Sequence, residues 1–292
     1  MTLSRYKCDV GVSEAISYTH CMDDTPNPNH FPRHCHDGYE LIYVSQGDGS
    51  YVVEGEEYSL GTRSLLLMPP HAFHHVKIDF SKPYERYIVN FKGSALPIEV
   101  RDALDRMFED MDRYGRFYGG ADIPEGVVPA LLCMEETPRL SAEDAKCYVV
   151  SLLSSILLRL SLDAPALSAG EQSALGARVV RYLNAHLTED ISLDVLAKNF
   201  FVSKFHLCRA FKEHNGVSVL QYLTEKRVMY AKHLVELGEA ANHAAAKVGF
   251  GDYSSFYRAH RRICGTAPRE SKHTPASLAN YGMKGAHHES GR

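Results

Sequence analysis

The chain has 292 residues, of which 45% are hydrophobic and 23% are charged, and it contains no tryptophan. This length predicts about two domains, and the composition is typical of a folded protein rather than a disordered one. No run of 18 apolar residues occurs, and the first nine residues lack the apolar core of a signal peptide. We therefore expect neither a membrane span nor a secretion signal.

The charge distribution and the cysteine content indicate the kind of partner and the redox compartment. The net charge is −4, but residues 173–275 hold 15 Lys and Arg against 9 Asp and Glu, a balance of +6 that leaves −10 for the rest. A basic C-terminal third joined to an acidic body suggests contact with a polyanion. The seven cysteines form no CxxC pair and have irregular spacing, which favours reduced thiols in the cytoplasm.

The N-terminal part has the pattern of a β-protein. Residues 1–30 are polar and rich in turn-forming residues, and we expect an arm with little regular structure. From Phe31 to Phe91 short β-branched and aromatic runs alternate with turns. The runs expected to form strands are 40–44, 50–53, 58–60, 64–68 and 84–91. Short strands with a turn about every ten residues predict a β-sandwich or barrel.

After Pro97, apolar residues recur at helical spacing. One helix is expected over 98–114, and a stretch rich in Gly and Pro follows over 115–129. A second helix is expected over 141–160, and its apolar stripe is wider than a lone surface helix needs. That stripe can be buried against the barrel, can form a dimer interface, or can do both.

The basic third contains a first helix-turn-helix pattern. Ser192 can cap one short helix, and Ser203 can cap the next, which is expected over 204–214. Gly216 can end that helix, because glycine tolerates the left-handed conformation. The inner face carries Leu207, Ala210 and Phe211. The outward-facing candidates are Lys204, His206, Cys208, Arg209 and Lys212.

A second unit repeats this pattern after a long helix expected over 219–235. A short helix over 241–247 and a glycine-containing turn lead to a helix over 253–262, which Asp252 can cap. Phe256 and Ala259 lie on its inner face. Its outward-facing residues are Tyr253, Ser254, Tyr257, Arg258 and Arg261.

The two units have matching internal spacing. Arg209 and Arg258 occupy equivalent positions, 49 residues apart. Two such units bridged by a long helix can place recognition helices in successive major grooves, about 34 Å apart along the duplex. One helix-turn-helix pattern is a weak signal, whereas two with the same spacing strongly favour a DNA-binding domain.

Residues 175–272 resemble the DNA-binding domain of the AraC/XylS family of bacterial transcription regulators. The matching residues are Ser192, Leu193, Leu196, Ala197, Ser203, Leu207, Arg209, Phe211, Lys212, Gly216, Arg227 and Ala231 in the first half, and Ala245, Val248, Gly249, Phe250, Asp252, Ser254, Phe256, Arg258, Gly265 and Pro268 in the second. The chain departs from the family at Ala241 and Ala244, where Ile is usual, at His260, where Phe is usual, and at Ser271–Lys272, where Tyr-Arg is usual. The lost apolar area, worth about 1–3 kcal/mol for each large side chain, predicts a less stable second half.

The resemblance implies which side chains meet DNA. Phe205, Cys208 and Arg209 occupy base-reading positions of the first recognition helix. Arginine is the commonest specific reader of guanine, and Cys208 is better suited to apolar contact with a thymine methyl group. In the second recognition helix the base-reading positions are Tyr253, Ser254, Tyr257 and Arg258. Lys204, Lys212 and Arg261 are the remaining predicted DNA contacts, and Lys212 and Arg261 are expected to hold phosphates.

A group of histidines near the N-terminus resembles a cupin signature. His34 and His36 lie two apart, as on one face of a strand, and Glu40 and His74 follow. Together they could form a metal site with three histidines and one carboxylate, which would indicate a metal-dependent cupin oxygenase or isomerase fused to a DNA-binding domain.

The sensory domain of AraC-type regulators resembles the same stretch and implies a small effector instead of a metal. We therefore predict no resident metal, no catalytic residue and no enzymatic activity. His71 and His75 are expected in loops. The residues predicted to bind the effector are His36, Glu40, Tyr43, Tyr51 and His74.

The sequence as a whole predicts an α+β multidomain protein, with a cupin-like β-barrel flanked by helices and an all-α domain that contains two helix-turn-helix units. The expected parts are an arm and barrel over 1–95, a helical dimerisation region over 96–162, a linker over 163–172, the DNA-binding domain over 173–275 and a disordered tail over 276–292. The expected function is transcription regulation modulated by a small molecule. The expected partners are double-stranded promoter DNA, the effector, RNA polymerase and a second copy of the chain, without a membrane.

Overall fold

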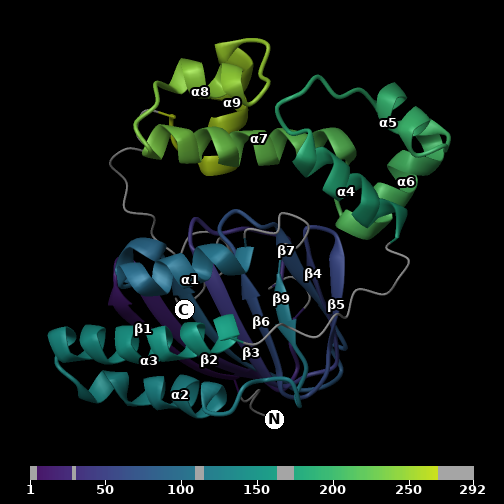
Figure 1. Ribbon diagram of the computed structural model, residues 1–292. Coiled ribbons are helices and arrows are strands. Elements are labelled where there is room, and N and C mark those ends of the chain that lie inside the picture. The colour runs from purple at the N-terminus through teal and green to yellow at the C-terminus, as the bar shows by residue number, and fades with distance from the viewer. Residues whose placement is uncertain (1–4, 28–30, 109–114, 163–173, 269–292) are drawn as a thin grey trace, which may run out of the picture. The chain divides into compact units, whose positions relative to one another are not determined.

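The computed structural model describes residues 5–27, 31–108, 115–162 and 174–268. The chain divides into two compact units, each drawn in Figure 1. Among the described residues, the first unit contains 5–53 and 57–162, and the second contains 54–56 and 174–268. The predicted linker over 163–172 and the predicted tail over 276–292 lie outside the described residues.

Two β-sheets form the frame of the first unit. The larger sheet has the strand order β1-β2-β8-β3-β6-β9, with neighbouring strands antiparallel, and the smaller has the order β5-β4-β7. The strands are β1 (Arg5–Ser13), β2 (Ile16–Asp23), β3 (Tyr39–Gln46), β4 (Gly49–Val53), β5 (Glu56–Leu60), β6 (Ser64–Met68), β7 (His74–Ile78), β8 (Tyr84–Phe91) and β9 (Arg116–Tyr118). The five predicted strand runs fall within β3, β4, β5, β6 and β8.

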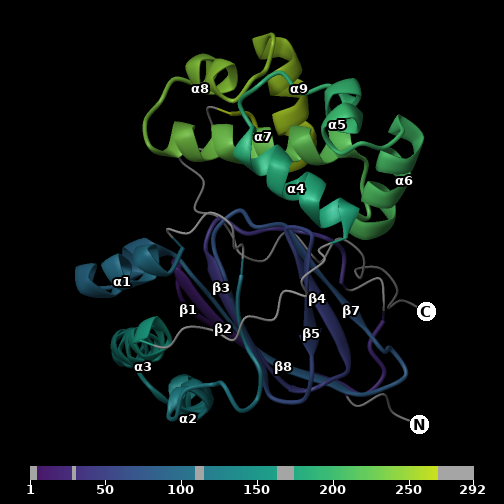
Figure 2. The same cartoon turned by 45° about the vertical axis from the view of Figure 1, so that its right-hand side comes forward.

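The two faces of the larger sheet bury different side chains. On β3, Ile42 and Val44 lie in the core between the sheets, whereas Leu41 and Tyr43 lie in the core between the sheet and the helices. This alternation follows from the two-residue period of a strand. Figure 2 shows the helices beside the larger sheet, on the side away from β4, β5 and β7. They are α1 (Ile98–Phe108), α2 (Val127–Cys133) and α3 (Ala142–Leu162), with short 3₁₀ helices η2 (Gly93–Ala95) and η3 (Met134–Arg139).

The prediction of an irregular N-terminal arm is wrong. β1 and β2 form a hairpin at the edge of the larger sheet, and β2 pairs with β8 from Ile16–Phe91 to Asp23–Tyr84. Ile16, Tyr18 and His20 are buried at alternate positions of β2. The polar residues between them face the other way. The segment is therefore polar on average, which hides the alternation of buried and exposed residues that indicates a strand. The elements α2, β7 and β9 were also not predicted, and His75, expected in a loop, lies in β7.

Helix α3 is long and apolar, although the sequence predicts no membrane span. By length and a mean hydropathy of 1.5 it is apolar enough to cross a membrane, with 33% of that segment buried. Core helices of soluble proteins have the same property, and one face of α3 packs against the sheet. The buried side chains are Ala145, Val149, Leu153, Ile156, Leu157 and Leu160. Core packing therefore explains the buried part of the apolar stripe.

The second unit is entirely helical among its described residues from 174 onward. Its helices are α4 (Leu175–Ala185), α5 (Leu193–Asn199), α6 (Lys204–Asn215), α7 (Val219–Glu236), α8 (Ala241–Lys247) and α9 (Tyr253–Cys264). α5 and α6 form one helix-turn-helix unit, α8 and α9 form the other, and α7 runs between them (Figure 1). Both units and the bridging helix are where the sequence predicts them.

Small residues let the second half pack closely. Val228, Ala231 and Val235 of α7 share a core with Ala244 and Phe256. His260, in a position expected to be apolar, is fully buried in this half. Its Nδ1 donates a hydrogen bond to the Thr266 carbonyl at 2.9 Å, and its ring meets Phe256 edge-on. The hydrogen bond to Thr266 therefore helps to accommodate the histidine at the end of α9.

Candidate functional site

Helix α6 is delimited by local signals at both ends. The Ser203 hydroxyl accepts the backbone N–H of His206 at 3.2 Å, which satisfies one of the amides that a helix start leaves unpaired. Gly216 ends the helix with φ of 75°, a conformation that glycine adopts without steric cost. Leu207 and Phe211 are fully buried. The opposite face of α6 is therefore left to solvent.

Helix α9 has the same construction. The Asp252 carboxylate accepts the backbone N–H of Ser255 at 2.8 Å, and Gly265 ends the helix with φ of 76°. Gly249, in the turn before it, has φ of 86°. Phe256 and Ala259 are buried, so α9 also presents its other face to solvent.

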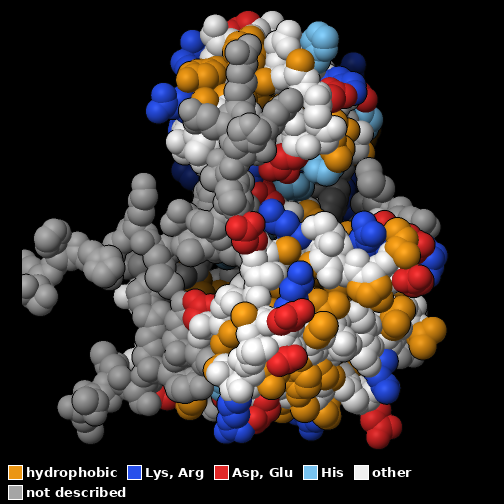
Figure 3. All heavy atoms as spheres, turned by 90° about the vertical axis from the view of Figure 1, so that its left-hand side faces the viewer, with side chains coloured by type: hydrophobic (Ala, Val, Ile, Leu, Met, Phe, Trp, Pro, Cys, Tyr) orange, Lys and Arg blue, Asp and Glu red, His pale blue; other side chains and the backbone are white. Residues whose placement is uncertain are grey.

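All ten side chains predicted to contact DNA lie at exposed or partly exposed positions of these two helices. Several make exposed contacts with neighbours: Lys204 lies 2.8 Å from Asp194, and Arg209 lies 2.8 Å from Glu213. Exposed ion pairs contribute at most about 1 kcal/mol, so a phosphate or base can replace these partners. Figure 3 shows Lys and Arg side chains exposed on the surface of the second unit. The ten residues are Lys204, Phe205, Cys208, Arg209, Lys212, Tyr253, Ser254, Tyr257, Arg258 and Arg261.

One arginine ties the two helix-turn-helix units together. Arg227 of α7 donates from Nε to the Leu187 carbonyl at 2.9 Å and from Nη1 to the Gly249 carbonyl at 3.0 Å. Its Nη2 donates to the Glu189 carbonyl. Arg227 thus joins the loop after α4 to the turn before α9. A Cβ on Gly249 would lie 2.9 Å from Nη2, so the turn needs glycine for space as well as for its φ angle.

Sequence reasoning missed an exposed aromatic residue at the first turn. Phe201, between α5 and α6, is 94% exposed and has φ of 55°, which is unusual for a large side chain. Phe205 on α6 is 77% exposed. Two exposed phenylalanines beside a candidate reading helix form an apolar surface suited to sugar or thymine-methyl contact. The turn sequence Asn199–Val202 contains no signal for this exposure.

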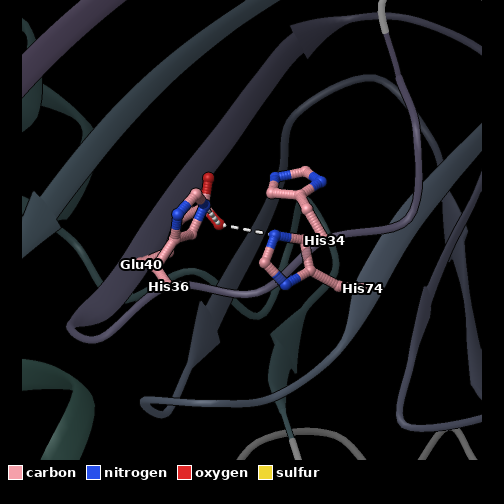
Figure 4. Close-up of side chains that lie close together, drawn as sticks. All are labelled: His34, His36, Glu40 and His74. Atoms are coloured by element: carbon pink, nitrogen blue, oxygen red, sulfur yellow. Dashed lines mark ion pairs between the residues drawn. The ribbon is translucent and has the colours of Figure 1, made fainter. Parts of the chain in front are cut away.

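A cluster of three histidines and one glutamate, with Glu40 and His74 buried and His34 and His36 partly buried, occupies the first unit. His34 and His36 come from the segment before β3, Glu40 from β3 and His74 from the start of β7. Figure 4 shows the four side chains turned toward one another. One potential ligand atom from each residue lies within 4.8 Å of the others. Glu40 Oε2 lies 2.9 Å from His74 Nε2 and 3.3 Å from His36 Nε2.

Backbone hydrogen bonds hold the segments that carry these four side chains. His34 and His74 form an isolated β-bridge, in which His34 N donates to His74 O at 3.0 Å and His74 N donates to His34 O at 2.8 Å. The backbone N–H of His71 donates to His36 O at 2.8 Å. On β3, Glu40 pairs with Met68 of β6 and with Asn90 of β8. The ligand-bearing segments are thus held beside each other.

The cluster perturbs the protonation of its members. Burial, with the nearby His74 and His36, lowers the pKa of His34 to about 3, so this ring is neutral in the folded protein. Burial acts to raise the pKa of Glu40, but His74 and His36 outweigh it and hold that pKa well below its usual range. Burial also lowers the pKa of His36, and the Glu40 charge outweighs it, so the net shift is upward. Glu40 is therefore a carboxylate in a buried site.

Four of the five predicted effector residues share this environment. Tyr51 lies in the core between the sheets, and burial, reinforced by Tyr84 and Glu40, raises its pKa well above the usual value. Tyr43 does not join them. It lies in the core on the helix side, where its ring meets Tyr87. Positions 40 and 43 are an odd number apart on one strand, so their side chains point to opposite faces; the prediction for Tyr43 needs this correction.

Two protein families match the chain. The family described as AraC-like ligand binding domain matches residues 21–121, and the family described as Helix-turn-helix domain matches residues 196–273. Together they span more than half of the chain and reach both units. The chain belongs to the AraC family of transcriptional regulators. It is a DNA-binding regulator whose activity is modulated by a ligand.

Curated AraC-family relatives extend over most of the chain. The HTH-type transcriptional activator RhaS of Klebsiella pneumoniae (strain 342) is 24% identical over 250 residues, which cover 82% of this chain and 87% of the relative. RhaS of Yersinia pestis (strain Pestoides F) is 22% identical over 250 residues, which cover 82% of this chain and 88% of the relative.

Solved structures similar to the chain include ToxT and the DNA-binding domain of AdpA. ToxT of Vibrio cholerae O395 is 12% identical with a TM-score of 0.35, over 88% of this chain and 97% of that chain. The DNA-binding domain of AdpA, a global transcriptional factor solved in complex with a target DNA, is 28% identical with a TM-score of 0.33, over 34% of this chain and 91% of that chain.

Proposed function

We propose that this AraC-family regulator reads promoter DNA through the exposed faces of α6 and α9. The observation that carries the proposal is that each helix is capped by a side chain, ended by a left-handed glycine and seated on a buried phenylalanine. Each therefore presents an arginine, Arg209 or Arg258, from a rigid support. A rigid helix with an exposed polar face is what major-groove reading requires.

The test is a titration of the full-length protein against its promoter fragment at fixed salt. Arg209→Ala and Arg258→Ala should each weaken specific binding by about 1–3 kcal/mol, because each removes a side chain able to bond two acceptors of one base. Arg139→Ala is the matched control, since Arg139 is an exposed arginine of the first unit. Unchanged affinity in both α6 and α9 variants would remove these arginines from the reading surface.

The effector is proposed to bind between the two sheets of the first unit. Its candidate contacts are His36, Glu40, Tyr51 and His74, which supply a carboxylate, a phenol and two imidazoles in a buried setting. A small polar molecule suits this lining, because buried polar groups need partners. Because such a ligand binds one arrangement of the protein better than another, it shifts the affinity for DNA.

The chain is proposed to act as a homodimer through α3. One face of α3 is buried against the sheet, while Leu158 is 42% exposed and Leu162 is 84% exposed on its remaining surface. Two copies can cover these leucines by packing their α3 helices against each other. The arrangement suits paired DNA sites, because a two-fold dimer matches a repeated operator.

The remaining parts of the proposed function follow from DNA binding. Relatives named as transcriptional activators favour activation, with RNA polymerase as a partner and the cytoplasm as the location. We also propose that the chain has no catalytic activity of its own. The histidine cluster then serves binding and not turnover.

A further inference from the structure

The histidine cluster has the donor set of a transition-metal site. Among the described residues, His34, His36, Glu40 and His74 are the group of His, Cys, Asp and Glu side chains with metal-binding spacing. Three imidazole nitrogens and one carboxylate oxygen suit Zn²⁺, Fe²⁺, Mn²⁺, Co²⁺ or Ni²⁺ and are a poor match for Ca²⁺ or Mg²⁺, which prefer oxygen ligands alone.

The outer hydrogen bonds of two histidines orient lone pairs toward the cluster. His34 Nδ1 lies 2.7 Å from the Pro32 carbonyl, and His74 Nδ1 lies 2.9 Å from the Ala72 carbonyl. A carbonyl only accepts, so each Nδ1 carries the proton. In the neutral imidazole Nε2 then has a lone pair available to an ion. A backbone carbonyl that fixes the tautomer in this way is the usual support of a metal-binding histidine.

The contact between Glu40 and His74 suits a bound cation. Their Oε2 and Nε2 atoms are 2.9 Å apart and buried, yet neither atom makes a well-aligned hydrogen bond. Nδ1 of His74 faces the Ala72 carbonyl, so the atom that meets Glu40 Oε2 is Nε2, the atom through which an Nδ1-protonated imidazole binds a metal. A cation among the four side chains makes both contacts favourable, and buried charges are stable only when paired or coordinated.

We propose that His34, His36, Glu40 and His74 bind one divalent transition metal ion. The metal would join the segment before β3 to the start of β7, where the only described backbone link between His34 and His74 is a single β-bridge. Metal binding would therefore stabilise the segment over 31–38. That the metal also modulates DNA binding rests on the proposed function, whereas metal binding itself does not.

The test begins with full-length protein prepared without a polyhistidine tag or chelator. We expect about one metal ion per chain by elemental analysis, or tight binding when apo protein is titrated with Zn²⁺ or Co²⁺. Glu40→Gln, which keeps the side-chain shape, and His74→Ala should each weaken binding at least ~10-fold, because each removes one of four ligands. His75→Ala, the neighbouring histidine on β7, should leave affinity unchanged.

Results that would overturn the metal site differ clearly from those that support it. Native-like protein that takes up no metal, or equal metal content in wild type, Glu40→Gln and His74→Ala, would overturn the site and leave the cluster as a Glu40–His74 ion pair. If His74→Ala does not fold, Glu40→Gln and hydrogen exchange decide. Metal should slow amide exchange over 31–38 in wild type and leave Glu40→Gln unaffected, and an unchanged exchange rate in wild type would contradict the proposal.

A DNA-binding measurement tests whether the bound metal also changes DNA affinity. Metal-loaded and apo protein are titrated against the promoter fragment, with Arg258→Ala as a variant that retains the cluster. A change in DNA affinity that Glu40→Gln abolishes supports metal-dependent regulation. Metal binding without any change in DNA affinity overturns the regulatory half of the inference and upholds the site. Metal binding that persists in Arg258→Ala while DNA binding fails shows that the two proposals stand or fall separately.

Discussion

Single side chains cap the starts of α6 and α9, the two helices proposed to read DNA. Ser203 and Asp252 each accept a backbone N–H three residues further on. Without these acceptors, amides at the first turn of α6 and α9 would have no partner within the helix. The reading residues Phe205 and Ser254 lie in or beside those turns. Capping therefore sets the positions of the side chains that are proposed to meet DNA.

Removing either cap should loosen the corresponding helix. We predict that Ser203→Ala and Asp252→Ala each lower stability by about 1 kcal/mol. Hydrogen exchange should show faster exchange in the first turn of α6 for one variant and of α9 for the other. Ser161→Ala is a suitable control, because the Ser161 hydroxyl bonds only within the last turn of α3. Equal protection in both cap variants and wild type would show that tertiary packing alone fixes these turns.

Burial of His260 predicts a pH-dependent stability of the second unit. Burial lowers the pKa of His260 from 6.5, the Thr266 hydrogen bond partly opposes this, and Lys232 reinforces it. The unfolded chain then binds a proton at His260 more readily than the folded chain. Stability is therefore fully present above pH 6.5 and falls as the pH drops below that value toward the folded-state pKa.

The measurement is urea unfolding of wild type and His260→Phe at pH 7.5 and at pH 5.5. Wild type should lose more unfolding free energy between these values than His260→Phe does, although other histidines contribute to both curves. Identical losses would mean that His260 titrates alike in the folded and unfolded chains.

At the scale of elements, α7 positions the two helix-turn-helix units through Arg227. Its guanidinium donates to carbonyls of Leu187, Glu189 and Gly249, which belong to different parts of the unit. Five donors in a planar fork allow this, and a lysine cannot reproduce it. The spacing between the reading helices should therefore depend on this side chain as well as on the length of α7.

We predict that Arg227→Lys weakens operator binding while non-specific DNA binding changes little. The charge is kept, but at least one carbonyl loses its donor, which should also lower stability by about 1–3 kcal/mol. Competition titrations with operator and random DNA measure the ratio of specific to non-specific affinity. Arg178→Lys, an exposed arginine of α4 in contact with Phe200, is the control. A proportional loss for both DNAs would assign Arg227 to phosphate binding.

The elements also show which features the sequence could predict. Caps and glycines are local signals, so α5, α6, α8 and α9 could be placed within a residue or two. The hairpin of β1 and β2 depends on pairing with β8 about 70 residues away, which no local pattern contains. In the barrel, the spacing of His34, His36 and Glu40 already indicated a shared face. The sequence pattern also placed His74 with them, and the bridge between His34 and His74 shows how the fold brings it there. Tyr43 was predicted with them as well, although the two-residue period of a strand puts positions 40 and 43 on opposite faces.

At the scale of the whole molecule, DNA binding and ligand binding are assigned to two different units. The basic balance of residues 173–275 favours DNA, whereas the acidic remainder contains the buried cluster. Phosphate contacts make DNA binding dependent on salt, and each lost contact lowers the salt slope by about one. Base contacts from Arg209 and Arg258 are proposed to supply sequence preference. The regulator thus separates sensing from reading.

Footprinting of the full-length regulator on its promoter tests this account most directly. Two reading helices in successive major grooves should protect two patches about 10 base pairs apart for each bound chain. Arg258→Ala should weaken protection of one patch, and Arg209→Ala should weaken protection of the other. A single protected patch, or loss of the same patch in both variants, would contradict the claim that α6 and α9 read DNA together.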